Sequence, residues 1–353
     1  MTTAATCDPT TAREAPLLDV HALQIVFPAG TRADPSMEAH AVDGVSFTVA
    51  RGESVCVVGE SGCGKSLTAL SLLRLVPPPG RIASGSRIVF DGDDILTLDR
   101  ERLRAIRGQH MAMIFQEPMT ALNPVLSVGD QIAEVLRVHT TLSRAERWAR
   151  TVAMLTQVGI ADAATRAKQY PHELSGGMRQ RVMIAMALIM SPKLVIADEP
   201  TTALDVTIQA QILELLRDLR ARTGMALLLI THDLGVVAEM ASRVIVMYAG
   251  RVVEEAPVQE LFAAPRHPYT KGLLAAIPRL GEDTDRLHTI TGSVPPPTAL
   301  PSGCAFRDRC PQAFARCATE EPALVSVGSA SRARCHLIDE PLRDTASGEA
   351  PRA

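Results

Sequence analysis

Features that define several other classes of protein are missing from this chain of 353 residues. Its 36 lysines and arginines are balanced by 39 aspartates and glutamates, so no basic excess favours a nucleic-acid partner. Its longest apolar run, Val182–Met190, is far shorter than the ~20 residues that cross a bilayer. The polar start, Met1–Pro16, lacks the pattern of a secretory signal. We therefore expect a soluble, cytosolic chain that has any membrane role through a partner.

An internal repeat, a long heptad pattern and a C-x-x-C spacing are also missing. Without C-x-x-C, the usual zinc-ribbon pattern is excluded. What the chain does have is length and apolar residues, which make up 46% of it. These allow a substantial core and two domains, one large and one small.

The stretch Gly59–Ser66 fits the phosphate-binding pattern G-x-x-x-x-G-K-[ST] at every fixed position. It follows the apolar run Val55–Val58 and precedes the helix-like run Leu67–Leu75, and this setting separates a true phosphate loop from a chance match. The glycines allow a tight bend in which successive N–H groups and the helix N-terminus point at an anion. Lys65 can reach the β and γ phosphates, and the Ser66 hydroxyl suits Mg²⁺. The sequence therefore predicts binding of a nucleoside triphosphate.

The candidate phosphate-binding residues are Gly59, Glu60, Ser61, Gly62, Cys63, Gly64, Lys65 and Ser66. Cys63 has no predicted catalytic role. Its thiol would lie next to helix N–H groups, which lower the pKa of a thiol, so we expect it to be unusually acidic.

A second motif is an apolar strand, Leu194–Ala197, that ends in the adjacent acids Asp198 and Glu199. Asp198 can hold Mg²⁺ through its water shell, because hard cations prefer oxygen ligands. Glu199 is then placed to polarise the attacking water as a general base. Alone, the pattern reads equally well as a strand ending in solvated acids; the phosphate loop favours the catalytic interpretation.

The segment Leu174–Gln180, with the sequence LSGGMRQ, reads as a helix start. Ser175 is a suitable N-cap, and Gly176 and Gly177 allow another backbone or a ligand to approach closely. A plain helix cap is the alternative interpretation of this segment.

Short apolar runs that alternate with helical patterns predict an α/β fold with a mostly parallel sheet. The predicted strands besides Val55–Val58 are Leu18–Phe27, Ala41–Val49, Arg87–Phe90, Met111–Phe115, Leu194–Ala197, Ala226–Ile230 and Val244–Tyr248. The predicted helices are Val128–Val138, Arg144–Val158, Met178–Met190 and Thr207–Thr223. We expect a disordered tail at 1–16, a nucleotide-binding domain at 17–255 with a helical insert at about 117–190, a small C-terminal domain at 256–340 and a tail at 341–353.

The phosphate loop, Gln116, LSGGMRQR, the Asp–Glu strand end and His232 stand in the order that is the signature of ABC-transporter ATPases. Residues Thr202–Asp205 resemble the D-loop of that family. The resemblance spans about residues 17–255. It implies a P-loop NTPase domain of the ABC type, with a mostly parallel sheet core, an antiparallel β subdomain and a helical subdomain.

The resemblance also implies roles for individual residues, with ATP as substrate and Mg²⁺ as cofactor. Gln116 would sense Mg²⁺ and the γ-phosphate, joining Ser66 and Asp198 at the metal, and His232 would contact the γ-phosphate beside Glu199. Ser175, Gly176, Gly177 and Asp205 would act at ATP sandwiched between two such domains, the first three in trans. Phe27 is the candidate for stacking on adenine, or else an ordinary core residue.

Four of the seven cysteines, Cys304, Cys310, Cys317 and Cys335, lie close together in the sequence near its end. In a cytosolic chain such a cluster suggests metal rather than disulfides. Four thiolates are the complement of a [4Fe–4S] cluster; Zn²⁺ and unligated thiols are the alternatives, and His336 is a possible substitute ligand. The segments Arg266–Lys271, Leu273–Pro278 and Gly303–Pro311 resemble the tail of dipeptide and oligopeptide importer ATPases, some of which carry such a cluster.

The resemblance implies a subunit whose ATP hydrolysis powers import of dipeptides or oligopeptides across the cytoplasmic membrane. Its partners would be a second, homologous ATPase chain, two transmembrane permease subunits and, indirectly, an extracytoplasmic substrate-binding protein. It would lie at the cytoplasmic face of the membrane as a peripheral protein, with Gln116–Pro124 against a permease helix. Import of nickel or another small solute is one alternative. A soluble non-transport ABC ATPase is another, although such proteins usually have tandem ATPase domains, coiled-coil inserts or basic surfaces.

Overall fold

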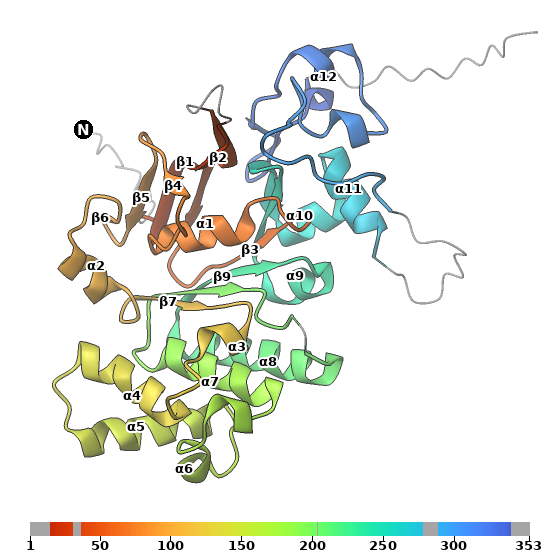
Figure 1. Ribbon diagram of the computed structural model, residues 1–353. Coiled ribbons are helices and arrows are strands. Elements are labelled where there is room, and N and C mark those ends of the chain that lie inside the picture. Colours follow the sequence, from red (N-terminus) through yellow and green to blue (C-terminus); the bar gives the residue numbers. More distant parts are fainter. Residues whose placement is uncertain (1–14, 31–36, 203, 278–288, 340–353) are drawn as a thin grey trace, which may run out of the picture.

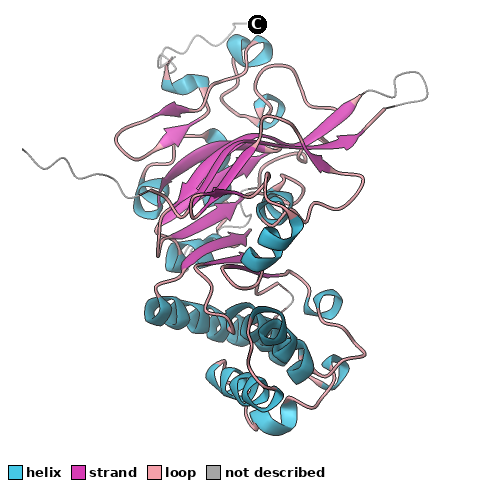
Figure 2. Ribbon diagram, turned by 90° about the vertical axis from the view of Figure 1, so that its left-hand side faces the viewer, coloured by secondary structure: helices cyan, strands magenta, loops and turns pink. Residues whose placement is uncertain are grey.

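The computed structural model describes residues 15–30, 37–202, 204–277 and 289–339. A large sheet with the order β12-β13-β11-β10-β3-β9-β8-β7 runs through the middle of the molecule (Figures 1 and 2). Its strands are β3 (Ser54–Val58), β7 (Met111–Ile114), β8 (Leu194–Asp198), β9 (Ala226–Thr231), β10 (Arg243–Tyr248), β11 (Arg251–Pro257), β12 (Val325–Ser326) and β13 (Arg332–Ala333). The tails expected at 1–16 and 341–353 lie outside the described residues, apart from residues 15 and 16.

Strands β10, β3, β9, β8 and β7 are parallel neighbours. Every residue of β3, β8 and β9 is buried, because both faces of the sheet are covered and neither is left wet. Helices pack on one face, and a second sheet and the helix after the phosphate loop pack on the other. Parallel strands also place their carboxyl ends at one edge of the sheet, where ligands of open α/β sheets bind. The predicted α/β fold with a mostly parallel core is therefore confirmed.

A second, antiparallel sheet lies beside the first and has the order β2-β1-β5-β6, with β4 paired to β1. Its strands are β1 (Leu18–Pro28), β2 (Glu38–Val49), β4 (Arg81–Ile82), β5 (Arg87–Phe90) and β6 (Asp93–Asp94). One hydrophobic cluster joins this sheet to α1 (Lys65–Leu72) and to β3, through buried residues such as Leu23, Val45, Val57 and Leu72. The antiparallel sheet is thus fixed against the helix that follows the phosphate loop.

The segment between Glu117 and Met190 consists of helices and turns in the described structure and forms the lower part of the molecule in Figure 1. That it is an insert in the domain stays a prediction. Its helices are α3 (Pro118–Ala121), α4 (Val128–His139), α5 (Arg144–Gln157), α6 (Ala163–Arg166), the 3-10 turn η1 (Pro171–Glu173) and α7 (Gly176–Leu188). Ser127 and Ser143 cap α4 and α5 by accepting backbone N–H groups of the first turn. Helix α7 buries Val182, Ile184 and Ala185 in the larger core.

The remaining helices are α2 (Arg100–Ile106), α8 (Val206–Thr223), α9 (Leu234–Met240), α10 (Val258–Ala263), α11 (Pro268–Ala275) and α12 (Ala315–Thr319), with 3-10 turns η2 (Arg307–Arg309) and η3 (His336–Ile338). No helix within the described ranges is both long enough and apolar enough to span a membrane.

Strand β11 was not predicted from the sequence, and the expected domain boundary at 255/256 falls inside it. It contains two acids, Glu254 and Glu255, which are 1% and 6% exposed. The Glu254 carboxylate accepts the backbone N–H groups of Arg266 and His267 at 2.7 and 2.8 Å, and Glu255 pairs with Arg243 and Arg332. Partners far away in the sequence therefore allow a charged segment to form a buried strand.

The C-terminal region is anchored on the large sheet by backbone pairing and by aromatic rings. Strand β13 pairs with β11, so the region extends the sheet. Tyr248 at the end of β10 packs against Tyr269 and Phe306, with ring centroids 4.8 and 5.1 Å away. Tyr269 and Phe306 come more than 200 residues after β3 in the sequence. These contacts place them next to β10, the strand that neighbours β3.

Candidate nucleotide-binding site

The predicted site residues meet at the carboxyl edge of the parallel sheet. The phosphate loop follows β3, and Gln116 lies just beyond β7. Asp198 ends β8 with Glu199 directly after it, and His232 follows β9. Since these four strands are parallel neighbours, residues that are far apart in the sequence become adjacent there.

Two glycines of the phosphate loop occupy positions that no other residue could fill without strain. Gly59 has φ 153°, and a Cβ there would lie 2.2 Å from the Met247 carbonyl oxygen. Gly64, the N-cap of α1, has φ 100°, and a Cβ there would lie 2.7 Å from the Ala41 carbonyl oxygen. The loop is therefore closed tightly between β10 and β2.

Lys65 lies inside the loop rather than in solvent. Its Nζ donates to the carbonyl oxygens of Gly59 at 2.8 Å and Glu60 at 3.0 Å. The residue is only 5% exposed. The ammonium group is thus held within the cradle, at the place where a phosphate chain would need a counter-charge.

The expectation of an acidic Cys63 thiol is wrong. Cys63 is fully buried and belongs to the core between the antiparallel sheet, α1 and β3. Burial raises the pKa of its thiol, and the nearby Lys65 only partly opposes this. The sequence shows that the residue lies in the loop, but not that its side chain faces the core.

Ser66 and Asp198 form the candidate magnesium site. The Ser66 Oγ donates to Asp198 Oδ1 at 3.0 Å, and Asp198 is 4% exposed. Burial raises the pKa of Asp198, although the Ser66 hydrogen bond acts in the opposite direction. A buried carboxylate beside a hydroxyl is an oxygen donor set that fits Mg²⁺, which keeps several waters and takes few protein ligands.

Three side chains converge on the carboxylate of Glu199. Gln116 Nε2 donates to Oε2 at 3.0 Å, Thr202 Oγ1 donates to the same oxygen at 2.8 Å, and His232 Nδ1 lies 3.3 Å from Oε1. Glu199 has a left-handed backbone with φ 45°, a strained conformation that is characteristic of functional sites. Gln116, Glu199 and His232 therefore lie together, and their roles at the γ-phosphate stay predictions. Thr202 was predicted only as part of the D-loop.

The surface above the loop is a groove of about 190 Å³. It is lined by Ala41, Ser61, Gly62, Gly64, Lys65, Ser66, Leu67, Gln116 and Glu199. Ala41 comes from β2 in the antiparallel sheet, and the sequence gives no signal for its presence. Phe27 is not among the described residues that line the groove: it is half-buried and packs on Gly80, where a Cβ would lie 2.5 Å from its ring. Its contact with adenine stays a prediction.

The LSGGMRQ segment forms the start of α7, away from the groove. Ser175 caps the helix by accepting the Met178 N–H at 3.4 Å, and Ser175 and Gly176 are exposed. Asp205 caps α8 in the same way, accepting the Ile208 N–H at 2.9 Å. Ile208 lies against Gly177, so close that a Cβ there would come within 2.9 Å of it. The signature turn and the start of α8 therefore pack together and present an exposed turn.

The predicted metal site at the C-terminal cysteines is not confirmed. Burial raises the pKa of the Cys304, Cys310 and Cys335 thiols, and repulsion from the neighbouring thiols adds to it. The fold thus gathers these sulfurs in one region. Within the described residues, however, no three Cys, His, Asp or Glu side chains are arranged as metal ligands. His336 is buried, and its Nε2 is hydrogen-bonded to the Glu320 carbonyl oxygen at 2.9 Å.

Comparison with known proteins agrees with this geometry. The pattern of the ABC transporter family matches residues 42–202, and that of the oligopeptide/dipeptide transporter C-terminal region matches residues 253–317. The chain belongs to the ABC-transporter family of ATPases, in its oligopeptide/dipeptide branch. As a member it is an ATP-hydrolysing transport enzyme.

Relatives match along nearly their whole length. The oligopeptide transport ATP-binding protein AppD of Bacillus subtilis is 54% identical over 301 residues, covering 85% of this chain and 92% of AppD. The dipeptide transport ATP-binding protein DppD of Escherichia coli is 48% identical over 330 residues, covering 93% and 99%. Among solved structures, a dimeric form of the bacterial ABC transporter cassette MJ0796 is 28% identical with a TM-score of 0.60, covering 68% of this chain and 98% of that chain.

The variant Asp198→Asn tests whether the buried charge of Asp198 destabilises the folded protein. Because the pKa of Asp198 is raised in the folded state, the folded protein binds its proton more tightly than the unfolded chain does. Its contribution to the free energy of unfolding therefore falls as pH rises through the window between the unfolded and folded pKa values. We expect Asp198→Asn to raise the thermal midpoint of the nucleotide-free protein by about 2–4 °C at neutral pH, measured by scanning calorimetry.

The matched control is Asp99→Asn, because Asp99 is an exposed N-cap of α2 and asparagine caps equally well. Its midpoint should not change. A lower midpoint for Asp198→Asn across the pH range would contradict the stated effect of burial.

Proposed function

We propose that this chain is the ATP-binding and ATP-hydrolysing subunit that powers import of dipeptides or oligopeptides across the cytoplasmic membrane. The observation that carries the proposal is the joint presence of a phosphate cradle with an internal lysine, a buried Ser66–Asp198 pair and a positioned Glu199. The match of residues 253–317 to the oligopeptide/dipeptide transporter C-terminal region supports peptide as the solute.

The phosphate loop would bind the triphosphate through its backbone. Ser61, Gly62 and Gly64–Ser66 line the groove at the N-terminus of α1, and their backbone N–H groups would favour negative charge there. Lys65 would exchange the carbonyl oxygens of Gly59 and Glu60 for the β and γ phosphates, which are stronger acceptors. Phe27 would stack on the adenine if β1 and the Gly80 turn shift to expose its ring.

Ser66, Asp198 and Gln116 would hold Mg²⁺ at the end of the groove. When bound, the ion neutralises charge that develops on the phosphate oxygens. Its arrival would also compensate the buried carboxylate of Asp198, whose pKa is raised by desolvation.

Glu199 would act as the general base and take the proton of the attacking water on a carboxylate oxygen. Thr202, donating at 2.8 Å, holds that carboxylate in place. Gln116 and His232 contact the same carboxylate, and we infer that both would turn from Glu199 toward the γ-phosphate when ATP binds.

A second ATPase chain would complete the site. Ser175 and Gly176 form an exposed helix start away from their own groove, and a helix N-terminus without its own anion suits a phosphate held by another chain. Asp205 lies at the adjoining start of α8. One solved relative is described as a dimeric ATP-binding cassette bound to ADP and phosphate. We take the partner to be a homologous but different chain.

Two permease subunits would receive the movement of the two ATPase chains. An extracytoplasmic binding protein would act through the permeases, and this chain would lie at the cytoplasmic face of the membrane. The segment around Gln116–Pro124 exposes apolar side chains: Met119, Val125 and Leu126 are 58%, 74% and 37% exposed. Such a patch next to the groove suits a protein partner and argues against a soluble non-transport ATPase.

Import of nickel or another small solute would use the same parts of this chain. Uptake by the assembled transporter, measured with labelled dipeptide and with Ni²⁺, distinguishes the two solutes.

The general-base role of Glu199 is tested by Glu199→Gln. The amide keeps the shape and the contact with Thr202 but cannot accept the proton. We expect ATP binding within a few-fold of the wild type and hydrolysis at least ~10²-fold slower, the scale for loss of a general base. Single-turnover hydrolysis measures this.

The matched control is Glu214→Gln, on the exposed side of α8, which should hydrolyse ATP normally. Near-normal turnover by Glu199→Gln would remove Glu199 from the role of base.

We also propose that Cys304, Cys310, Cys317 and Cys335 hold a [4Fe–4S] cluster, with Zn²⁺ as the alternative metal. Four thiols meet the ligand number of such a cluster. The sulfurs of Cys304, Cys310 and Cys335 each receive backbone N–H groups from residues two or three positions further along, an arrangement that stabilises thiolates. We also propose that the chain divides into two domains at about 255/256, so that the cysteine region is a unit of its own.

Anaerobic purification of the full chain tests the metal. We expect a brown protein that contains iron and sulfide and loses both in Cys335→Ser, while Cys7→Ser, which lies outside the cluster in the sequence, retains them. A colourless protein with one zinc per chain would favour zinc, and a metal-free chain would leave the cysteines as plain thiols.

A further inference from the structure

The C-terminal region contacts the phosphate loop directly, at Glu60. Arg309 in turn η2 donates through both terminal nitrogens, Nη1 to Glu60 Oε2 at 2.6 Å and Nη2 to Oε1 at 2.9 Å. The Tyr269 hydroxyl oxygen accepts the backbone N–H of Glu60 at 2.8 Å. Two residues more than 200 positions downstream therefore bind both the side chain and the backbone of one loop residue.

Arg309 is itself held in place. Its Nε donates to the Thr291 carbonyl oxygen at 2.9 Å, and its guanidinium lies 5.7 Å from the ring centre of Tyr248 and 6.0 Å from that of Phe306. The side chain is 6% exposed. Its hydrogen bonds to Glu60 raise its pKa further above the usual arginine range. The pair is thus a fixed, bidentate ion pair, which is stronger and more specific than a single surface contact.

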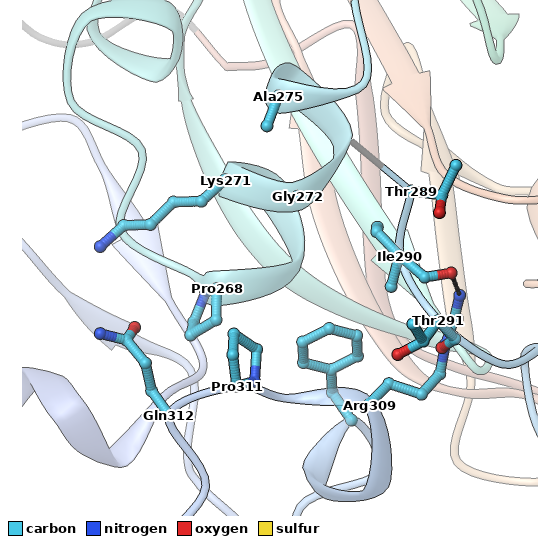
Figure 3. A pocket seen from close by; sticks show the side chains of 11 residues that line it. Pro268, Lys271, Gly272, Ala275, Thr289, Ile290, Thr291, Arg309, Pro311 and Gln312 are labelled. Atoms are coloured by element: carbon cyan, nitrogen blue, oxygen red, sulfur yellow. Dashed lines mark hydrogen bonds between the residues drawn. The ribbon is translucent and has the colours of Figure 1, made fainter. Parts of the chain in front are cut away.

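The environment of the pair also allows substitution without collapse of a packed core. Arg309 lines a cavity of about 490 Å³ together with Lys271, Thr291, Pro311 and other residues, and Figure 3 shows it reaching from the turn before Pro311 toward the 289–291 segment. A shorter side chain at 309 would enlarge a space that already opens to solvent. Glutamine keeps the first three side-chain carbons of arginine, so Arg309→Gln removes the hydrogen bonds of the guanidinium more than it removes packing.

Glu60 is fixed on its other side by the lysine of the cradle. Its carbonyl oxygen accepts from Lys65 Nζ at 3.0 Å. When Lys65 turns to a phosphate, this contact is released, and Arg309 and Tyr269 are the contacts that continue to hold Glu60.

We propose that Arg309 and Tyr269 are positioning residues for the phosphate loop: the C-terminal region keeps the loop in its anion-binding shape, so affinity for ATP depends on that region. The inference rests on the proposed ATP site. A loop that is held in its bound shape binds more tightly because it loses less conformational freedom on binding. The competing explanation is that the pair only attaches the C-terminal region to the ATPase domain.

Affinity for Mg-ATP of the full chain, measured by calorimetry, separates these explanations. We expect Glu60→Gln and Arg309→Gln each to raise the Kd by about tenfold, the scale of one lost charge-assisted hydrogen bond. The double variant should be no weaker than the weaker single variant, because both remove the same contact. Tyr269→Phe should also raise the Kd, since it leaves the Glu60 N–H without its acceptor.

Arg307→Gln is the matched control. Arg307 lies in the same turn η2, but it donates to Ser302 and Ala318. Both partners belong to the C-terminal region, so this variant disturbs that region without touching Glu60. If a general disturbance of the region weakened ATP binding, Arg307→Gln would raise the Kd as much as Arg309→Gln does. We expect an unchanged Kd, with the thermal midpoints of all variants compared to confirm folding.

The proposal is overturned if Glu60→Gln and Arg309→Gln bind within twofold of the wild type, if their effects multiply in the double variant, or if Arg307→Gln is equally impaired. Lys65→Ala distinguishes failure of the underlying site: undiminished ATP binding by that variant would overturn the ATP site itself, whatever the Arg309 variants show.

Discussion

The architecture depends on one demand of anion binding: several backbone N–H groups must point into the same small space. A chain satisfies this only by closing tightly, and the closure is visible where Gly59 lies on the Met247 carbonyl and Gly64 on the Ala41 carbonyl. These two carbonyls belong to different sheets, since Met247 is in β10 and Ala41 is in β2. The phosphate loop is thus shaped by the junction of the two sheets, and a change in either would reach the groove.

The same edge of the sheet collects the acids that the chemistry needs, at some expense of stability. Asp198 is buried with a raised pKa, and Glu199 has a strained backbone and three polar neighbours. A site of this kind is destabilising until cation and phosphate arrive. Mg-ATP bound there would therefore stabilise the folded protein, which is a suitable basis for a transport enzyme that responds to its nucleotide.

The sequence predicts much of the fold because the buried parallel strands are short apolar runs with clear limits. The predicted strands Leu194–Ala197 and Ala226–Ile230, for example, each end one residue before β8 and β9 do. It predicts the site because the phosphate loop and the Asp198–Glu199 strand end are local patterns. Strand β11 was missed because its two acids are paired with distant residues. Contacts between distant segments, such as Thr202 with Glu199 or Arg309 with Glu60, leave no local pattern in the sequence.

The central claim is that ATP is held by two chains, one giving the cradle of Gly59–Ser66 and the other the exposed helix start at Ser175. The most direct measurement is a structure of this chain with its partner ATPase, in which hydrolysis is blocked and Mg-ATP is bound. The account predicts that Ser175 and the Gly176 N–H lie within hydrogen-bonding distance of the γ-phosphate bound by the other chain. A nucleotide that contacts a single chain, with Ser175 facing solvent, would contradict it.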